Sequence, residues 1–299
     1  EQFGPETLAT CIGGPHAVYW PLHRFMTLFG SPNNVGIGQI CWNPGTLLHA
    51  ISYGWTLDNE LEPDLTGCLM LWGANHAESD NSLLWHRIQQ YSRTGKPLIV
   101  VDPRRTRTAE LATHWLPVRP GTDPVLALGL ISAIIQHRWY DAPFVDTWCH
   151  GFARLAGHLE PYTPGYVAEV TGIPAEQLLE VARLYARQRP SALFTGRGID
   201  QIGRNSVPAH HAFDILRAIT GNIARKGASC ITGMPDFIPE LDLELSDQFL
   251  ETQRKKQLGQ LKLQSYHGYE QIRKLTSKQG KRLPMRYLTS TQPNLVWQA

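Results

Sequence analysis

The chain has 299 residues, of which 42% are hydrophobic and 18% are charged, and its net charge is +2. A length of about 150 residues per domain predicts two domains, the apolar content excludes a disordered chain, and no run reaches the roughly 18 apolar residues of a membrane span. Charged residues usually make up about 25% of a soluble protein, so we expect polypeptide outside this chain to cover part of its surface.

Short apolar runs alternate with amphipathic stretches of helical length along the chain. The runs predicted as strands are 66–73, 97–102, 114–119 and 191–195. The stretches predicted as helices are 78–94, 106–112, 123–135, several pieces of 141–188 broken at Gly151, Pro161, Pro164 and Pro174, and 205–223. The run 66–73 is continuous rather than alternating, which is typical of a strand buried on both faces. This alternation predicts an α/β fold with a mainly parallel sheet.

Polar residues and glycines follow three of the predicted strands, where open α/β sheets bind ligands. Gly73 lets the chain turn and lets backbone approach a ligand. The Asp102 carboxylate can accept hydrogen bonds from a ribose or a base edge, and Arg104 can grip phosphate. These features predict a nucleotide along the sheet edge, although a glycine there also fits a plain turn and Asp123 a plain helix cap. No GxGxxG motif occurs, which argues against an ordinary NAD site.

The cysteines form no recognisable metal or disulfide framework. They are Cys11, Cys41, Cys68, Cys149 and Cys230, with gaps of 30, 27, 81 and 81 residues. Without a CxxC pair this chain alone is expected to bind neither zinc nor an iron–sulfur cluster. Cys41 precedes a helix that begins near Pro44, where the helix dipole favours a thiolate, although a small buried hydrophobe is the alternative. The adjacent His210 and His211 point about 100° apart on a helix and are interpreted as structural.

The charges are unevenly distributed near the C-terminus. Residues 254–282 hold nine Lys or Arg and one acid, a net charge of +8, after an acidic run between Asp236 and Glu251. Such a stretch can dock nucleic acid or a protein partner. We interpret it instead as a solvated surface excursion, and we expect no nucleic acid, because it lacks the Gly-aromatic patterning of RNA-binding segments.

Four motifs in this order resemble the catalytic subunits of the molybdenum and tungsten bis-pterin oxidoreductases, the dimethyl sulfoxide reductase superfamily. The motifs are Trp72-Gly-Ala-Asn75, Val101-Asp-Pro-Arg-Arg-Thr106, Arg119-Pro-Gly-Thr-Asp123 and Gly196-Arg-Gly-Ile-Asp-Gln201. Further parallels are the Cys41 turn, Ile219-Thr-Gly-Asn222 and Phe3-Gly-Pro-Glu6. The likeness covers nearly the whole chain. The acidic-then-basic stretch is most similar to the acetylene hydratase branch.

The resemblance implies two nested Rossmann-like, doubly wound α/β domains with mainly parallel sheets, incomplete versions of the formate dehydrogenase and dimethyl sulfoxide reductase domains. Residues 1–46 and 190–299 would form the first domain, incomplete at its C-terminal end. Residues 47–189 would form an inserted dinucleotide-binding domain. The start at Glu1 and the end at Ala299 fall in mid-pattern, so we expect a larger polypeptide.

The implied cofactor is bis-molybdopterin guanine dinucleotide carrying Mo or W, with Cys41 as the catalytic residue and metal ligand. Asn75 and Glu78 match positions that hold one dinucleotide, and Asp102 and Arg104 match its guanosine-binding pair. The full set of implied cofactor contacts is Gly73, Asn75, Glu78, Asp102, Arg104, Thr106, Gly121, Asp123, Gly196, Gly198 and Gln201. Of these, Gly121 and Asp123 match another guanine contact, and Gly196, Gly198 and Gln201 match a loop close to the metal.

The chain also departs from the family pattern. Trp42 stands where formate dehydrogenases carry a His, so formate is not the expected substrate, and Ala224 replaces a common Gly. The N-terminal cysteine cluster for a [4Fe–4S] centre and the C-terminal barrel-like domain lie outside this chain. The implied partners are these domains of the same polypeptide and an electron-transfer subunit, in a bacterial or archaeal cytoplasm or periplasm.

The resemblance implies oxygen-atom or electron-pair transfer on a small substrate, with the 299-residue piece inactive alone. Two alternatives remain: a non-redox hydratase of the same family, and a metal-free structural subunit of a respiratory complex. Retention of Cys41, Asp102, Arg104 and Asp123 favours a metal enzyme over the structural subunit, because a cofactor-free scaffold has no chemical use for that set.

Overall fold

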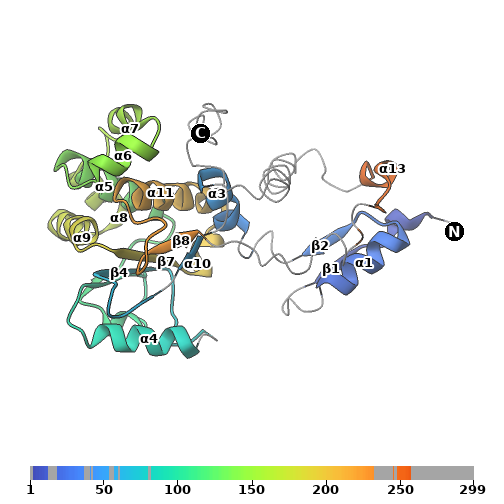
Figure 1. The fold of residues 1–299 in the computed structure, drawn as a ribbon, viewed down its shortest axis with the longest axis horizontal. Helices are drawn as coiled ribbons and strands as arrows, with labels where there is room; N and C mark the ends of the chain where they lie inside the picture. The colour runs from blue at the N-terminus through green and yellow to red at the C-terminus, as the bar shows by residue number, and fades with distance from the viewer. Residues whose placement is uncertain are drawn as a thin grey trace. The chain divides into compact units, whose positions relative to one another are not determined.

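The computed structural model describes residues 3–12, 19–36, 41, 43–53, 57–59, 61–79, 82–231, 245 and 248–256. These residues belong to two compact units (Figure 1). Unit 1 lies within Glu1–Cys41 and Gly233–Gln279, and unit 2 lies within Trp42–Thr232. Most of the predicted acidic and basic stretch lies outside the described residues. No helix in the described part of the chain is long and apolar enough to cross a membrane.

Unit 1 contains a small β-α-β arrangement. Its elements are η1 (Pro5–Thr7), β1 (Thr10–Ile12), α1 (Tyr19–Phe29), β2 (Asn34–Gly36) and α13 (Glu251–Arg254). The two strands pair in parallel, with Thr10 opposite Asn34. The Asn33 side chain donates a 2.7 Å hydrogen bond to the Glu6 carbonyl, and Lys256 Nζ lies 3.0 Å from Glu6 Oε1. Glu6 therefore joins segments that are far apart in the sequence.

Unit 2 is built on a four-stranded parallel sheet with the order β6-β5-β4-β7. The strands are β4 (Cys68–Trp72), β5 (Leu98–Val101), β6 (His114–Leu116) and β7 (Ser191–Thr195). Every residue of β4 and β5 is buried, as their continuous apolar runs predict. The predicted α/β fold with a parallel sheet is confirmed.

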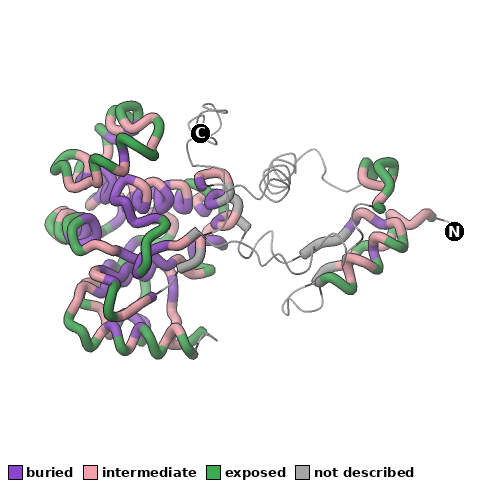
Figure 2. Tube along the Cα trace, viewed as in Figure 1, coloured by how far each residue is buried: buried purple, intermediate pink, exposed green. Residues whose placement is uncertain are grey.

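Helices cover both faces of this sheet (Figure 1). The helices of this unit are α3 (Asn43–Tyr53), α4 (Ser82–Ser92), α5 (Asp123–Gln136), α6 (Ala142–Trp148), α7 (Phe152–His158), α8 (Pro164–Thr171), α9 (Ala175–Arg187), α10 (Arg197–Asp200) and α11 (Ser206–Ile219), with 3-10 turns η3 (Ala109–Leu111) and η4 (Gly203–Asn205). Met70 and Trp72 pack in the core formed with α5, α9 and α11, whereas Leu69 and Leu71 pack in the core formed with α4. Figure 2 shows the buried strands between the two helix layers.

The structure corrects several predicted boundaries. The predicted helix over 78–94 spans only Ser82–Ser92, because residues before it form a turn in which the Asn75 carbonyl accepts the backbone N–H groups of Glu78 and Ser79 at 3.2 and 3.1 Å. The predicted helix over 106–112 is the 3-10 turn η3. The predicted breaks at Gly151, Pro164 and Pro174 fall at the starts of α7, α8 and α9.

Two features of unit 2 bear on the expected domain division. An antiparallel pair that the sequence did not predict, β3 (Leu57–Asn59) with β8 (Ser229–Ile231), joins the segment after α3 to the last described residues of this unit. Strand β7, assigned from the family arrangement to the first domain, pairs in parallel with β4 of the expected inserted domain. The nested boundaries at 46 and 190 stay a prediction about the intact protein.

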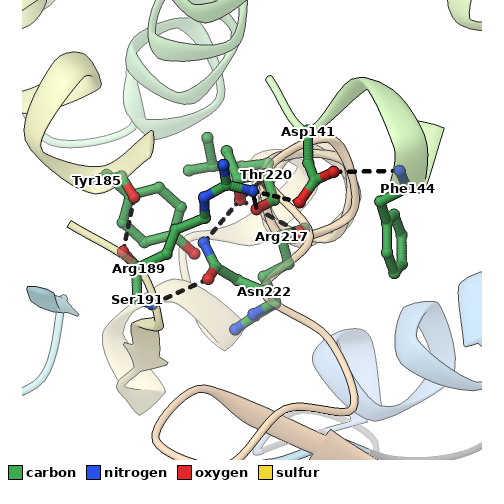
Figure 3. Close-up of polar contacts among 9 residues, drawn as sticks. Asp141, Phe144, Tyr185, Arg189, Ser191, Arg217, Thr220 and Asn222 are labelled. Carbon is green, nitrogen blue, oxygen red and sulfur yellow. Dashed lines mark hydrogen bonds and ion pairs between the residues drawn. The ribbon is translucent and has the colours of Figure 1, made fainter. Parts of the chain in front are cut away.

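A polar network holds the start of β7 at the amino end of the sheet (Figure 3). The Asn222 side chain accepts the Ser191 N–H at 2.9 Å and donates to Thr220 Oγ1 at 2.8 Å. The Arg189 guanidinium pairs with Asp141, which also accepts a backbone N–H in the first turn of α6. The residues after α11 are thus fixed against the strand that leads to Gly196.

Candidate functional site: the carboxyl edge of the unit 2 sheet

The four strands of the unit 2 sheet run parallel, so their carboxyl ends meet at one edge. We call this the carboxyl edge and define it by the loops 73–79, 102–108, 117–123 and 196–205. All the predicted cofactor contacts other than Cys41 lie in these loops. The structure therefore brings together residues that are up to 128 positions apart, from Gly73 to Gln201. Their role in binding stays a prediction.

Two glycines allow the loops after β4 and β7 to touch. The Gly196 N–H donates a 2.9 Å hydrogen bond to the Trp72 carbonyl. A Cβ at Gly196 would lie 1.9 Å from the Gly73 carbonyl oxygen, which no side chain tolerates. Gly73 itself has a positive φ of 57°, a conformation that favours glycine. At Gly198 a Cβ would meet the same oxygen at an ordinary 3.4 Å. Packing between loops therefore explains Gly196 and Gly73, and it leaves Gly198 unexplained.

Asn75 is fixed by the neighbouring loop. Its side-chain oxygen accepts a 2.9 Å hydrogen bond from the Thr108 hydroxyl, which in turn accepts the Ala77 N–H at 3.2 Å. An amide whose oxygen is already engaged keeps its NH₂ group for a ligand. Glu78, in the same turn, is exposed.

The loop after β5 orients a carboxylate and a hydroxyl. Asp102 is 7% exposed, and its Oδ1 accepts the Arg104 N–H at 2.8 Å. No protein hydrogen bond reaches Oδ2 from the described residues, so this oxygen is available to a ligand. Thr106 is buried and accepts the Ala109 N–H at 3.1 Å, which fixes the 3-10 turn. The Arg104 side chain is exposed.

Asp123 is a second buried carboxylate at this edge. Its Oδ1 accepts a 2.8 Å hydrogen bond from the indole N–H of Trp72. Burial raises the pKa of Asp123 and the charge of Asp102 raises it further, while the Trp72 hydrogen bond opposes the shift. Gly121 has a positive φ of 83°, and its carbonyl accepts from the Asn205 side chain at 2.7 Å. This contact joins the loop after β6 to the one after β7.

The loop after β7 is anchored to the first turn of α3 through Asp200. The Asp200 Oδ1 accepts the Gly45 N–H at 3.2 Å and lies 2.9 Å from His210 Nε2. Burial alone would raise the pKa of Asp200, but His210 and Arg197 outweigh it and the pKa is lowered. A Cβ at Gly45 would lie 2.8 Å from the His210 ring. The expected structural role of His210 agrees with these contacts. Gln201, one residue further on, is exposed.

Cys41 belongs to unit 1, whereas the carboxyl edge belongs to unit 2. Its thiol is free and half-buried. It lies four residues before Gly45 in the sequence, on the segment that leads to α3. Its role as a metal ligand stays a prediction. Trp42, expected to exclude formate as the substrate, lies outside the described residues.

Sequence reasoning missed the residues that hold the predicted ones in place. Thr108 fixes Asn75, Asn205 fixes Gly121, and Trp72 fixes Asp123. The only available signal was chemical, because each is a hydrogen-bond donor within or next to a recognised motif. His76 was also missed, although it follows Asn75 directly.

The fold and the edge define an α/β protein whose parallel sheet presents carboxylates, an amide and glycines at the strand ends. A family model described as molybdopterin oxidoreductase matches residues 6–297. The chain belongs to this molybdopterin oxidoreductase family, which confirms the resemblance read from the motifs.

Relatives and a solved structure agree with this assignment. The chain is 34% identical to acetylene hydratase of Syntrophotalea acetylenica over 86% of this chain and 35% of that protein. It is 30% identical to the dimethyl sulfoxide reductase DmsA of Haemophilus influenzae, over 73% of this chain and 31% of that protein. The solved acetylene hydratase from Pelobacter acetylenicus matches with a TM-score of 0.76 at 34% identity, over 86% of this chain and 35% of that one. The chain thus spans about a third of the length of these relatives.

Proposed function

We propose that the carboxyl edge binds the guanine end of a pterin guanine dinucleotide, and that the intact protein is a molybdenum or tungsten enzyme. One observation carries the proposal: Asp102 and Asp123, two buried carboxylates, reach the same edge from neighbouring loops. Guanine presents adjacent N–H donors, which carboxylates accept in pairs. Asn75 and Arg104 add an amide and a guanidinium, which suit base or ribose groups and phosphate.

The donor set at the edge fits this cofactor. Asp102 keeps Oδ2 for a ligand, and a Cβ added at Gly121 would meet no atom closer than Asn205 Nδ2, at an ordinary contact distance of 3.8 Å. Asp102 and Asp123 would accept from guanosine, Asn75 and Glu78 would hold one dinucleotide, and the glycines would let backbone approach it. The buried Trp72 indole excludes water from beneath Asp123.

Cys41 is the residue proposed to bind the metal. Among the described residues, no three His, Cys, Asp or Glu side chains come together to hold a metal ion. A metal held by one protein thiolate needs its other ligands from elsewhere, and soft sulfur ligands suit Mo and W. When bound, the cofactor would supply those sulfurs and the two-electron chemistry.

The reaction that we propose is oxygen-atom or electron-pair transfer on a small substrate, with electrons leaving through an iron–sulfur part of the polypeptide. The second candidate is a non-redox hydration, which the 34% identity to an acetylene hydratase favours. We also propose that further domains of the same polypeptide complete the metal site, and that an electron-transfer subunit binds the redox form. A bacterial or archaeal cytoplasmic or periplasmic location fits either candidate.

Metal and nucleotide analysis of the purified protein tests the proposal. We expect Mo or W together with GMP released by acid hydrolysis. Cys41→Ala should lower the metal content, and Asp102→Asn should lower the GMP content, whereas the exposed control Glu110→Gln should change neither. Turnover without an electron acceptor would favour the hydratase. A protein purified without metal, pterin and GMP would overturn the proposal in favour of a structural subunit.

A further inference from the structure

His76 lies in the turn after β4, and both of its ring nitrogens are buried without a hydrogen-bond partner among the described residues. Each such unpaired group costs about 1–3 kcal/mol of folding free energy. Burial lowers the pKa of His76, so the ring is neutral and carries one N–H donor and one acceptor. Buried polar groups in native proteins are nearly always paired, so this residue lacks a partner that another molecule can supply.

The turn that carries His76 is held on both sides. The preceding Asn75 accepts from Thr108 at 2.9 Å, and the following Ala77 donates to the same hydroxyl at 3.2 Å. Gly73, at the start of the turn, is fixed against the loop after β7. The backbone that carries His76 is therefore tied to two neighbouring loops of the carboxyl edge.

The missing partners must offer both an acceptor for the ring N–H and a donor for the other nitrogen. A nucleoside diphosphate offers both, because its phosphate oxygens accept and its ribose hydroxyls donate. A base edge is already matched by the Asp102 and Asp123 carboxylates, which can only accept when ionised. Phosphate, in contrast, finds no donor among those carboxylates, whereas an imidazole N–H is a suitable one.

We propose that His76 is a binding residue that donates a hydrogen bond to a phosphate oxygen of a guanine nucleotide at the carboxyl edge. This inference rests on the proposed function and adds a residue that the motifs did not indicate. In this role His76 strengthens nucleotide binding but destabilises the nucleotide-free protein, where its ring nitrogens are unpaired. A histidine retained for structure would instead stabilise the nucleotide-free protein, so the two roles can be distinguished by experiment.

The test measures GDP and guanosine binding by calorimetry and the melting temperature without nucleotide, for the wild type, His76→Phe and the control His86→Phe. His86 is an exposed histidine on α4. For His76→Phe we expect GDP binding to weaken about tenfold or more, guanosine binding to weaken by a clearly smaller factor because only its ribose can contact the ring, and the melting temperature to rise by about 2–4 °C. His86→Phe should leave all three unchanged.

Further measurements keep the inference falsifiable if His76→Phe folds poorly. The ¹⁵N resonance of the ring N–H of His76 in the wild type should shift when GDP is added and shift much less when guanosine, which lacks phosphate, is added. His76→Gln, which keeps one donor and one acceptor, should lose less GDP affinity than His76→Phe. Unchanged GDP affinity in His76→Phe, an equal loss for GDP and guanosine, or unmoved ring resonances would each overturn the inference.

The failure of this inference can be distinguished from the failure of the proposed function. Suppose that the wild type binds GDP, that Asp102→Asn weakens GDP binding and that His76→Phe does not. In that case only the proposed role of His76 is wrong. If the wild type binds neither GDP nor guanosine, both are overturned.

Discussion

The indole nitrogen of Trp72 donates a 2.8 Å hydrogen bond to the carboxylate of Asp123, and both residues are buried. Trp72 ends β4 and Asp123 begins α5, so the bond connects the core of the sheet to its carboxyl edge. The carboxylate that we expect to contact guanine is therefore oriented from beneath by a residue of the hydrophobic core.

Trp72→Phe should remove this donor and leave a cavity. We expect the free energy of unfolding to fall by about 2–4 kcal/mol and GDP binding to weaken, as measured by urea denaturation and calorimetry. Trp148→Phe, at an exposed residue of α6, is the matched control and should change stability by less than about 0.5 kcal/mol. Equal effects of the two substitutions would show that the bond does not position Asp123.

The pH dependence of stability should reveal the burial of Asp123. Burial raises its pKa in the folded state, so the folded protein binds this proton more tightly than the unfolded chain does. The ionised carboxylate therefore weakens the fold at pH 7, and the penalty disappears as the pH falls through the folded pKa.

Asp123→Asn keeps an acceptor for Trp72 and cannot ionise. We expect it to unfold at higher urea concentration than the wild type at pH 7, with the difference shrinking towards pH 4, and to bind GDP about tenfold more weakly. The exposed control Asp146→Asn should show no such pH-dependent difference. A difference that grows on acidification would contradict the assigned direction of the pKa shift.

Gly196 and Gly198 form a matched pair for testing contact between loops. Gly196→Ala would place a methyl group 1.9 Å from the Gly73 carbonyl oxygen, whereas Gly198→Ala would place one at 3.4 Å. We expect Gly196→Ala to destabilise the protein by more than about 3 kcal/mol, because backbone must move, and Gly198→Ala to stay within about 1 kcal/mol. Thermal melts of both variants check this. Similar melting temperatures would mean that the two loops separate at little cost.

Replacing Ala224 by glycine should stabilise the protein. It has a positive φ of 54°, a conformation that costs an L-residue about 1 kcal/mol. Ala224→Gly should therefore raise the free energy of unfolding by about 0.5–1 kcal/mol. The control Ala153→Gly, at an exposed position within α7, should lower it by about the same amount. Destabilisation by both would show that unfolded-chain entropy outweighs the strain at Ala224.

The main strands and the edge that they share could be predicted from the sequence for a physical reason. Runs such as Leu98–Val101 are apolar throughout because both faces of the sheet are covered. Once the strands are parallel, the residues that follow them must meet at one edge. The residues from Gly73 to Asp123 were thus placed by pattern, which also predicted a nucleotide at this edge, while the identity of the cofactor came from the family resemblance.

Long-range side-chain contacts could not be predicted in this way. The hydroxyl of Thr108 and the amide of Asn205 select their partners only once the loops lie together, and no local pattern encodes that choice. Helix α4 begins at Ser82 rather than at the predicted Glu78, because the N–H groups of Glu78 and Ser79 bind the Asn75 carbonyl and form a turn there. The sequence shows Ala224 where the family commonly has Gly, but it does not show that this residue has a positive φ.

The pairing of Leu57 with Ile231 brings the chain that follows α3 back beside the C-terminal end of the described part of unit 2. A segment whose ends already meet adds little closure entropy to the chain that carries it. Helix α3 lies outside this closed segment but contributes Gly45, whose N–H binds Asp200, so a self-folding nucleotide-binding piece should begin before α3 and end after β8.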